Sequence, residues 1–197
     1  MRVSWAKLLE DINQCEKCGL CAGRNHVVPG EGNPQAKLML IGEGPGQEED
    51  RQGRPFVGRS GELLTRMLHA IGLERSEVYI CNVVKCRPPQ NRDPEPEEAM
   101  TCLDYLRAQV ALVRPQIVVL LGKVACRYTL NEPVFITRDH GRWYERKGVW
   151  FMPTFHPSAL LRDPAKKRDA WEDFQKIRDK LRELNPETEG EDGYGKI

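Results

Sequence analysis

The chain has 197 residues, of which 40% are hydrophobic and 30% are charged, with 30 Lys and Arg against 29 Asp and Glu. No apolar run reaches the length of roughly 18 to 20 residues that a membrane span requires, so we expect no membrane partner. The balanced charge excludes a protein that is basic over its whole surface, and any surface that binds a polyanion must be local.

The N-terminus and the cysteines indicate the compartment. The first residues, MRVSWAKLLEDINQC, lack both the long apolar stretch and the small-residue cleavage site of an export signal. The seven cysteines are an odd number, which favours reduced thiols or metal ligands over a disulfide framework. We therefore expect a cytoplasmic protein, and we expect it to be a monomer.

Apolar runs and helical patterns alternate along the chain. Four short apolar runs have the composition of buried strands in a parallel sheet: KLMLIG (37–42), VYICNVV (78–84), QIVVLLG (116–122) and VWFMPTF (149–155). Helical spacing is found over residues 61–73, over residues 94–115 and in a charged segment from 164 to 184. The stretch HPSALLRDP (156–164) is predicted to be too short and too broken for a helix.

This order of elements predicts the fold class. It favours an α/β protein with three α/β/α layers around a central, mostly parallel four-stranded sheet. One domain is expected over residues 1–184, and the polar, Gly-rich residues 185–197 are predicted to form a disordered tail. Because ligands of such sheets bind beyond the carboxyl ends of the strands, residues 42–46, Asn82 and His156 are expected at one rim.

Four of the cysteines form a candidate metal site. Cys15 and Cys18 make a CxxC pair, and Cys86 and Cys102 follow later in the chain. Four thiolates hold either a zinc ion or a [4Fe–4S] cluster, and ligand type alone does not separate the two. Cys21 is a rival ligand, and the alternative is that only the CxxC matters or that these are buried apolar thiols.

Three loop motifs occur here in a specific order with these cysteines. They are GEGPGQEEDRQGRPFVGRSGELL (42–64), NVVKCRPPQNRDP (82–94) and HPSALL (156–161). Together they resemble the family 4 uracil-DNA glycosylases, the iron–sulfur branch of that superfamily, over roughly residues 10–183. The resemblance implies a single α/β/α domain that removes uracil from DNA and a structural [4Fe–4S] cluster. Its cluster ligands would be Cys15, Cys18, Cys86 and Cys102.

The resemblance also implies roles in a pocket that receives the base. His156 would donate to uracil O2 and support the departing anion, and Phe56 would stack on the flipped base. Asn82 would read the Watson–Crick edge, because an amide can donate to O4 and accept from N3–H. Gly42 and Gly44 would let the backbone approach the base. The alternatives are structural: a histidine or phenylalanine that only packs, and an amide that caps a strand end.

Two carboxylates near the glycines are candidates for further roles. At positions where the family 1 relatives have an aspartate and a tyrosine, this chain has Gly44 and Gly46. Glu49 matches the acid that is thought to exclude the thymine methyl group, and its alternative is a solvated acidic turn. Glu43 is the nearest carboxylate that could polarise water or offset the sugar cation. In the alternative for Glu43, the phosphates of the substrate stabilise that cation.

Two segments are predicted to contact DNA. Leu160, with Leu161, would fill the gap left by the flipped nucleotide, and Arg162 would hold a phosphate. Core packing is the alternative for the two leucines. Three cations of a Pro-rich loop would hold the DNA backbone, with a solvated loop as the alternative. They are Lys85, Arg87 and Arg92.

The predicted function is DNA repair by a monofunctional glycosylase. It would flip uracil out of DNA and hydrolyse the N-glycosidic bond, which leaves an abasic site and free uracil. The alternative is an iron–sulfur protein that traps uracil in DNA without turnover. The covalent branch of the superfamily carries a basic loop like KRRIH, whereas CRPPQNRDP follows Lys85 here. A third possibility, an electron carrier, is disfavoured because the four cysteines are spread along the chain.

Overall fold

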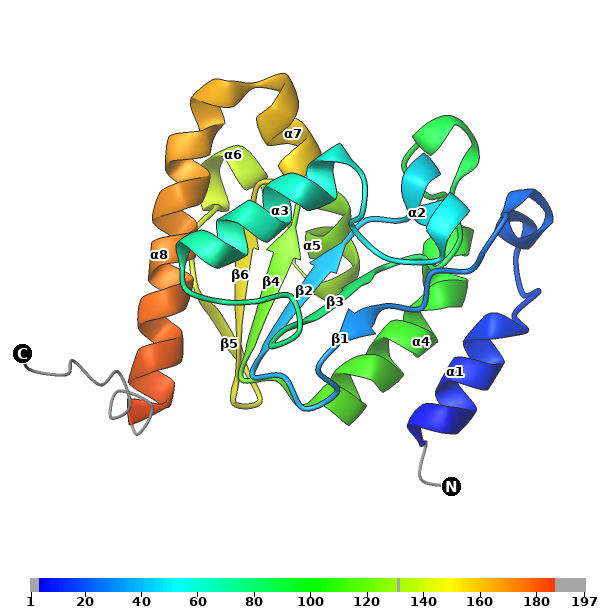
Figure 1. Cartoon of the computed structure of the whole chain (residues 1–197), viewed down its shortest axis with the longest axis horizontal. Helices are drawn as coiled ribbons and strands as arrows, with labels where there is room; N and C mark the ends of the chain where they lie inside the picture. The colour runs from blue at the N-terminus through cyan, green and yellow to red at the C-terminus, as the bar shows by residue number, and fades with distance from the viewer. Residues whose placement is uncertain (1–3, 131, 187–197) are drawn as a thin grey trace, which may run out of the picture.

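A six-stranded sheet in the order β1-β3-β2-β4-β6-β5 forms the centre of the computed structural model (Figure 1). The structure describes residues 4–130 and 132–186, so residues 187–197 of the predicted tail lie outside the described residues. The four inner strands are parallel, and each coincides with a predicted apolar run. They are β3 (Tyr79–Asn82), β2 (Leu38–Gly42), β4 (Ile117–Leu121) and β6 (Val149–Thr154).

The predicted number of four strands is wrong, because a short antiparallel strand is added at each edge. The strand β1 (Glu31–Gly32) pairs with β3, and β5 (Tyr144–Arg146) pairs with β6. Each has only two or three residues, and neither has the run of apolar side chains that marks a buried strand. The parallel core of the sheet is therefore as predicted, and its edges are not.

Helices follow the inner strands and cover the sheet. The three long predicted helices are present as α3, α4 and α8, the last after a short 3₁₀ turn. The longer helices are α1 (Trp5–Asn13), α3 (Arg59–Ala70), α4 (Pro96–Val113) and α8 (Lys167–Leu184). The shorter ones are α2 (Gln47–Gln52), α5 (Lys123–Thr129), α6 (Ile136–Asp139) and α7 (Pro157–Arg162). The 3₁₀ turns are η1 (Gly19–Gly23), η2 (Pro89–Asn91) and η3 (Pro164–Lys166).

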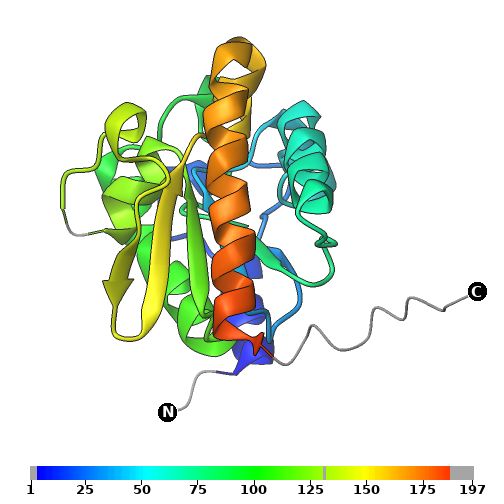
Figure 2. The same cartoon turned by 90° about the vertical axis from the view of Figure 1, so that its left-hand side faces the viewer.

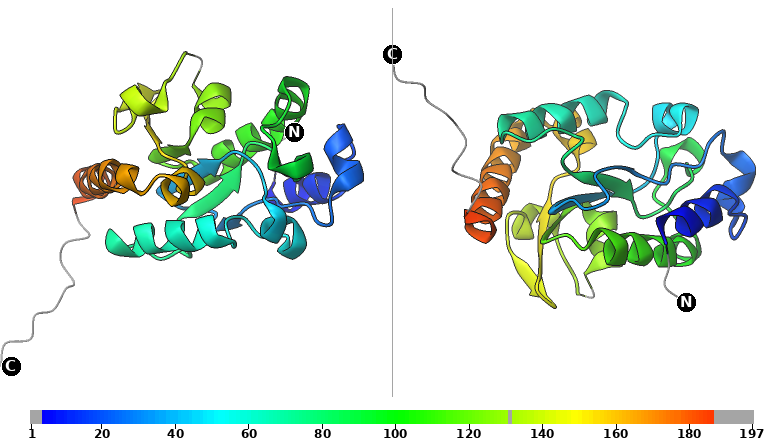
Figure 3. Two further views of the ribbon diagram at one scale, coloured as in Figure 1. Left: turned by 90° about the horizontal axis from the view of Figure 1, so that it is seen from above. Right: turned by 60° about the horizontal axis from the view of Figure 1, so that its bottom comes forward.

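The sheet carries an apolar core on each face, because successive side chains of a strand point to opposite sides. Met39 and Ile41 of β2 pack with residues of α1 and α4, whereas Leu38 and Leu40 pack with residues of α3 and α8. Figure 3 shows α3 on one side of the sheet and α4 and α5 on the other. In Figure 2, α8 runs along the edge of the layers. The predicted three-layer α/β/α fold is confirmed.

The stretch HPSALLRDP forms a helix, contrary to the prediction. Pro157 occupies the first position of α7, where its fixed φ angle and missing N–H suit a helix start. His156 caps the helix, because its side chain accepts a hydrogen bond from the backbone N–H of Ser158. The proline therefore begins a helix at this point in the chain.

A candidate active site at the carboxyl ends of the strands

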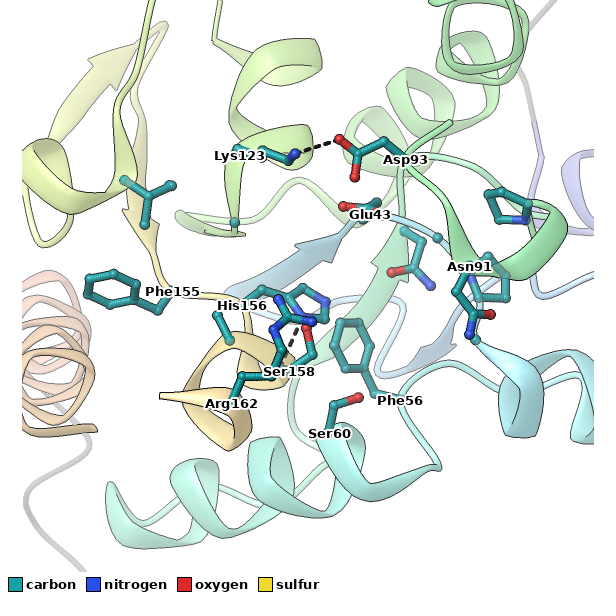
Figure 4. Close-up of a pocket in the computed structure, with 18 of the residues that line it drawn as sticks. Glu43, Phe56, Ser60, Asn91, Asp93, Lys123, Phe155, His156, Ser158 and Arg162 are labelled. Carbon is teal, nitrogen blue, oxygen red and sulfur yellow. Dashed lines mark hydrogen bonds and ion pairs between the residues drawn. The ribbon is translucent and has the colours of Figure 1, made fainter. Parts of the chain in front are cut away.

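A cavity of about 560 Å³ lies beyond the carboxyl ends of the inner strands (Figure 4). This volume is within the usual range for a small-molecule site. Its wall comes from the loop after β2, the end of β3, the start of α5, and the junction between β6 and α7. It brings together six of the seven residues predicted to bind uracil, all except Gly42: Glu43, Gly44, Glu49, Phe56, Asn82 and His156.

Asn82, the last residue of β3, presents a buried polar group that lacks a partner. The residue is 1% exposed, and its Oδ1 makes no hydrogen bond among the described residues. Leaving a buried acceptor unpaired is unfavourable, so this amide is a candidate to accept a hydrogen bond from a ligand. Gly42, its partner in β2, provides the room, because a Cβ there would collide with Asn82 Oδ1 and the Phe56 ring.

His156 has a defined tautomer. Its Nδ1 accepts from the backbone N–H of Ser158 at 3.2 Å and lies 2.8 Å from the hydroxyl of the same serine. A neutral ring with Nδ1 as acceptor carries its proton on Nε2. Burial, and to a lesser degree the charge of Arg162, lowers the pKa of His156 to about 4. The imidazole is therefore neutral at neutral pH and has one N–H to donate.

Phe56 is held in a backbone conformation that bulky residues rarely adopt. Its φ angle of 51° lies in the left-handed region. Arg75 donates to the Phe56 carbonyl at 3.1 Å, and Glu49 accepts at 2.9 Å from each of the two backbone N–H groups that follow Phe56. These bonds fix the ring in the cavity wall, with its centroid 5.6 Å from that of His156.

The two predicted carboxylates have different environments. Glu49 is 8% exposed, and besides the two bonds after Phe56 its Oε2 accepts from the N–H of Gly46 at 3.1 Å. The alternative of a solvated turn is therefore wrong for Glu49. The Glu43 carboxylate makes no hydrogen bond to another described residue, and burial, with a smaller effect of Asp93, raises its pKa to about 7.

The two leucines that were predicted to enter the DNA lie in helix α7 and differ in burial. Leu160 is 1% exposed and packs against Leu63, Phe155 and Ala170. The prediction that Leu160 fills the gap in the duplex is wrong for this conformation, because the side chain is enclosed in the core. Leu161 is half-buried beside the same cluster, and Arg162 is exposed at the edge of the cavity.

The three cations of the predicted basic loop also differ in exposure, because one is buried and two are partly exposed. Lys85 is 1% exposed, so the prediction that it contacts DNA is wrong. Arg87 donates to Asn91 Oδ1 at 2.8 Å. Arg92 lines the cavity and donates both terminal nitrogens to the Glu98 carboxylate, at 2.8 and 2.7 Å. Both arginine side chains are partly exposed, and both are engaged in hydrogen bonds within the chain.

The four predicted ligand cysteines line one small cavity next to this loop. Cys15, Cys18, Cys86 and Cys102 share it with the rival thiol Cys21. Within residues 4–130 and 132–186, no three Cys, His, Asp or Glu side chains are grouped as ligands of a metal ion. The four thiols thus line one common space, and this donor set suits either a zinc ion or an iron–sulfur cluster.

Sequence reasoning did not select several residues of the two cavities. Lys123, which begins α5, forms an ion pair of 2.6 Å with Asp93 across the main cavity. Ser158 could have been found from the HPS motif, and Lys123 from its place after β4. Arg24 had no such signal; it donates to the carbonyl of Cys15 at 2.6 Å and to Cys86 Sγ at 3.4 Å.

The helices of the described chain include none that combines the length and the apolar character of a membrane span. This finding agrees with the absence of a long apolar run in the sequence.

Comparisons with known proteins identify the family. The model of the uracil DNA glycosylase superfamily matches residues 29–179. A type-4 uracil-DNA glycosylase of Sulfurisphaera tokodaii is 45% identical over 89% of this chain and 84% of its own length. The type-4 enzyme of Thermotoga maritima is 46% identical over 86% and 90%, and that of Archaeoglobus fulgidus is 44% identical over 86% and 89%. The chain belongs to the type-4 branch of the uracil-DNA glycosylase superfamily.

Proposed function

We propose that the protein excises uracil from DNA by hydrolysis of the N-glycosidic bond, which leaves an abasic site and free uracil. The observation that carries this proposal is the buried Oδ1 of Asn82, which has no hydrogen-bond partner in the part of the chain that the structure describes. The same cavity contains the neutral imidazole of His156. Since a base inside a duplex cannot reach such a cavity, the nucleotide must first be flipped out of the stack.

Recognition of the base follows from the hydrogen-bonding groups of the pocket. Asn82 Oδ1 accepts from uracil N3–H, and the amide nitrogen donates to O4. Cytosine presents an acceptor at N3 and a donor at its exocyclic amine, so it would leave both groups of the amide unpaired. His156 donates from Nε2 to O2, and Phe56 stacks on the face of the ring.

Glycosidic cleavage separates charge, and the pocket has a group for each product. The C1′–N1 bond breaks with its electron pair on uracil N1, and the N–H of His156 stabilises the resulting anion at O2. Water then adds to the cationic C1′ and loses a proton. Glu43, with a pKa of about 7, is partly ionised at neutral pH and is the group that takes this proton.

Glu49 and the glycines shape the wall of the pocket. The Glu49 carboxylate is fixed by three backbone N–H groups, so it is a rigid part of the wall, placed to exclude the C5 methyl group of thymine. Gly44 lets the backbone pass close by, because a Cβ at Gly44 would collide with the side chain of Val84. Selectivity for uracil over thymine would then depend on a fixed wall.

Contacts with the DNA are assigned to the side chains that reach the rim. Leu161 is the apolar group that enters the gap in the duplex, and Arg162 binds a phosphate beside it. Arg87 and Arg92 hold the backbone on the opposite side of the cavity.

A [4Fe–4S] cluster is proposed at Cys15, Cys18, Cys86 and Cys102, where it would tie the N-terminal segment to the loop after β3 and to α4. When bound, the cluster supplies structural cross-linking and takes no part in the hydrolysis. Arg24 supports this site, because it joins the backbone at Cys15 to the sulfur of Cys86.

The activity is tested with a uracil-containing oligonucleotide and a catalytic amount of protein. Strand breaks after hot alkali, in molar excess over the protein, are expected. The matched variant Asn82→Leu keeps a side chain of similar size without the amide, and we expect it to lose excision. Breaks independent of uracil would contradict the proposal, and stoichiometric shifted bands without breaks would favour a protein that traps uracil.

The cluster is tested by its visible absorption and by iron analysis. We expect a brown protein whose absorption and iron are lost in a Cys86→Ala variant, together with a lower melting temperature. A colourless protein that contains zinc would contradict the assignment.

A further inference from the structure

Lys85 is among the largest of the fully enclosed side chains of the described residues, and it is the one that is a cation. Removing a lysine ammonium from water is costly, so a lysine in such a place needs a physical reason. The predicted contact with phosphate does not supply one, since the side chain does not reach the surface.

The Lys85 ammonium donates to two uncharged oxygens. One is the backbone carbonyl of Asn82, at 2.6 Å, and the other is Oε1 of Gln109, also at 2.6 Å. The amide nitrogen of Gln109 is bound in turn by the carbonyl of Pro29 at 2.7 Å and the hydroxyl of Tyr79 at 3.1 Å. Because neither acceptor is a carboxylate, these two hydrogen bonds do not cancel the positive charge. The charge also acts on the buried thiols of Cys81 and Cys102.

The first of these bonds acts on the residue whose amide faces the cavity. The peptide that follows Asn82 is held from β2, since the N–H of Val83 donates to the Gly42 carbonyl at 3.0 Å. Lys85 holds the carbonyl of that same peptide. Both ends of the peptide are therefore fixed, which holds the backbone of Asn82 in place at the cavity wall.

We propose that Lys85 is a positioning residue for excision, which locks Asn82 in place and sets a buried positive charge behind the amide that receives the departing base. This inference rests on the proposed function. A charge in a poorly hydrated interior is weakly screened, so it favours the state in which negative charge develops on uracil. The effect is larger in the transition state than with the bound substrate, so it acts on the rate of the chemical step.

Lys85 also connects the pocket to the cavity of cysteines, which it lines. Cys86 follows it in the chain, and the Lys85 backbone forms a hydrogen bond with the sulfur of Cys102. Its partner Gln109 belongs to α4, the helix that contains Cys102. Lys85 therefore contacts both Asn82 and the cavity of the cysteines.

The test compares two leaving groups. Lys85→Met keeps the apolar stem and removes the charge, and Lys85→Gln removes the charge but retains a donor for the Asn82 carbonyl. Each variant is given uracil and 5-fluorouracil in the same oligonucleotide under single-turnover conditions. Because the 5-fluorouracil anion is the more stable one, it needs less help from the protein. We expect the rate of uracil excision to fall about 30- to 100-fold. The rate of 5-fluorouracil excision should fall only about 3- to 10-fold.

Gln109→Leu is the matched control, because it removes the other acceptor of the ammonium and leaves the bond to Asn82. We expect it to lower the melting temperature while the ratio of the two excision rates stays at the wild-type value. Melting temperature and cluster absorption are measured for every variant, and Lys85→Gln carries the test if Lys85→Met does not fold. An equal loss for both bases, or no loss, would overturn the inference. A wild-type protein that excises neither base would overturn the proposed function instead.

Discussion

The loop of residues 42–46 and helix α2, which follows it, each contribute one glutamate to the same cavity, yet the two carboxylates are in opposite states. Glu49 in α2 accepts three backbone hydrogen bonds, whereas Glu43 in the loop accepts none from the described residues. A carboxylate that the backbone has saturated is part of the architecture, and one without partners is available for proton transfer. Hydrogen bonding, and not nearness to the motif, distinguishes the two carboxylates, and the roles proposed for them follow from this difference.

The largest effect is expected for Glu43→Gln. If Glu43 takes the proton from water, single-turnover excision should fall about 100- to 10,000-fold, with no loss of melting temperature. The same replacement at Glu49 tests the comparison directly, because it should cost stability first and reduce excision less. A Glu43→Gln variant that excises at the wild-type rate would assign stabilisation of the sugar cation to the phosphates of the substrate.

The two leucines of α7 show a similar contrast, because Leu160 is packed in the core and Leu161 is partly exposed. Leu160→Ala should lower the free energy of unfolding by about 2 to 5 kcal/mol, because it opens a cavity in the core. Leu161→Ala should lower stability less, because the side chain is only half-buried, and should weaken binding to an abasic duplex. Denaturant unfolding and DNA titration of the two variants separate these outcomes, and the opposite pattern would return the wedge to Leu160.

A smaller loss is expected for Glu49→Gln. The amide can accept fewer of the three backbone hydrogen bonds, so the free energy of unfolding should fall by about 1 to 3 kcal/mol. Glu48→Gln, on the same helix, is the control, because its exposed ion pair with Arg51 should contribute less than about 1 kcal/mol. Equal effects of the two replacements would show that the hydrogen bonds of Glu49 are not stabilising.

The smallest effect is that of pH. Because the pKa of Glu43 is about 7, excision should fall roughly tenfold from one pH unit above that value to one unit below, and the limb should be absent in Glu43→Gln. The titration of His156 should cause no second change in the excision rate near neutral pH, since its pKa is about 4.

The titration of Glu43 should also change the free energy of unfolding, which should fall as pH rises while the rate of excision increases. A carboxyl whose folded pKa is raised contributes stability below its ordinary pKa, and this contribution is lost as pH rises through about 7. In denaturant unfolding, the free energy of unfolding of Glu43→Gln should therefore increase relative to that of the wild type as pH rises. A constant difference would mean that Glu43 does not titrate in this range.

Much of the fold could be predicted because its inner strands are continuous apolar runs with helical patterns between them. The strands β1 and β5 could not, since pairing with a neighbour defines them and their side chains carry no signal. Helix α7 was missed because residues 156–164 were considered too short and too broken for a helix, although a proline at a first helical position favours one.

The site was predictable to the extent that its residues follow strands. Asn82 and His156 were found because parallel strands end at one rim. The inward direction of Lys85 was not predictable, because its two acceptors are a backbone carbonyl and Gln109, a residue far along the chain. The different environments of Glu43 and Glu49 likewise depend on the backbone N–H groups that surround each side chain, and composition does not reveal these.

The two short outer strands also affect how the protein tolerates crowding. An open sheet edge is a template on which another chain can add a strand, and proteins limit this hazard by keeping such edges brief. Because β1 has two residues and β5 has three, each edge of the sheet offers few backbone groups for pairing with a strand of another chain. We expect concentrated or heated protein to resist growth of fibrils through its folded state, with any aggregation beginning from unfolded chains.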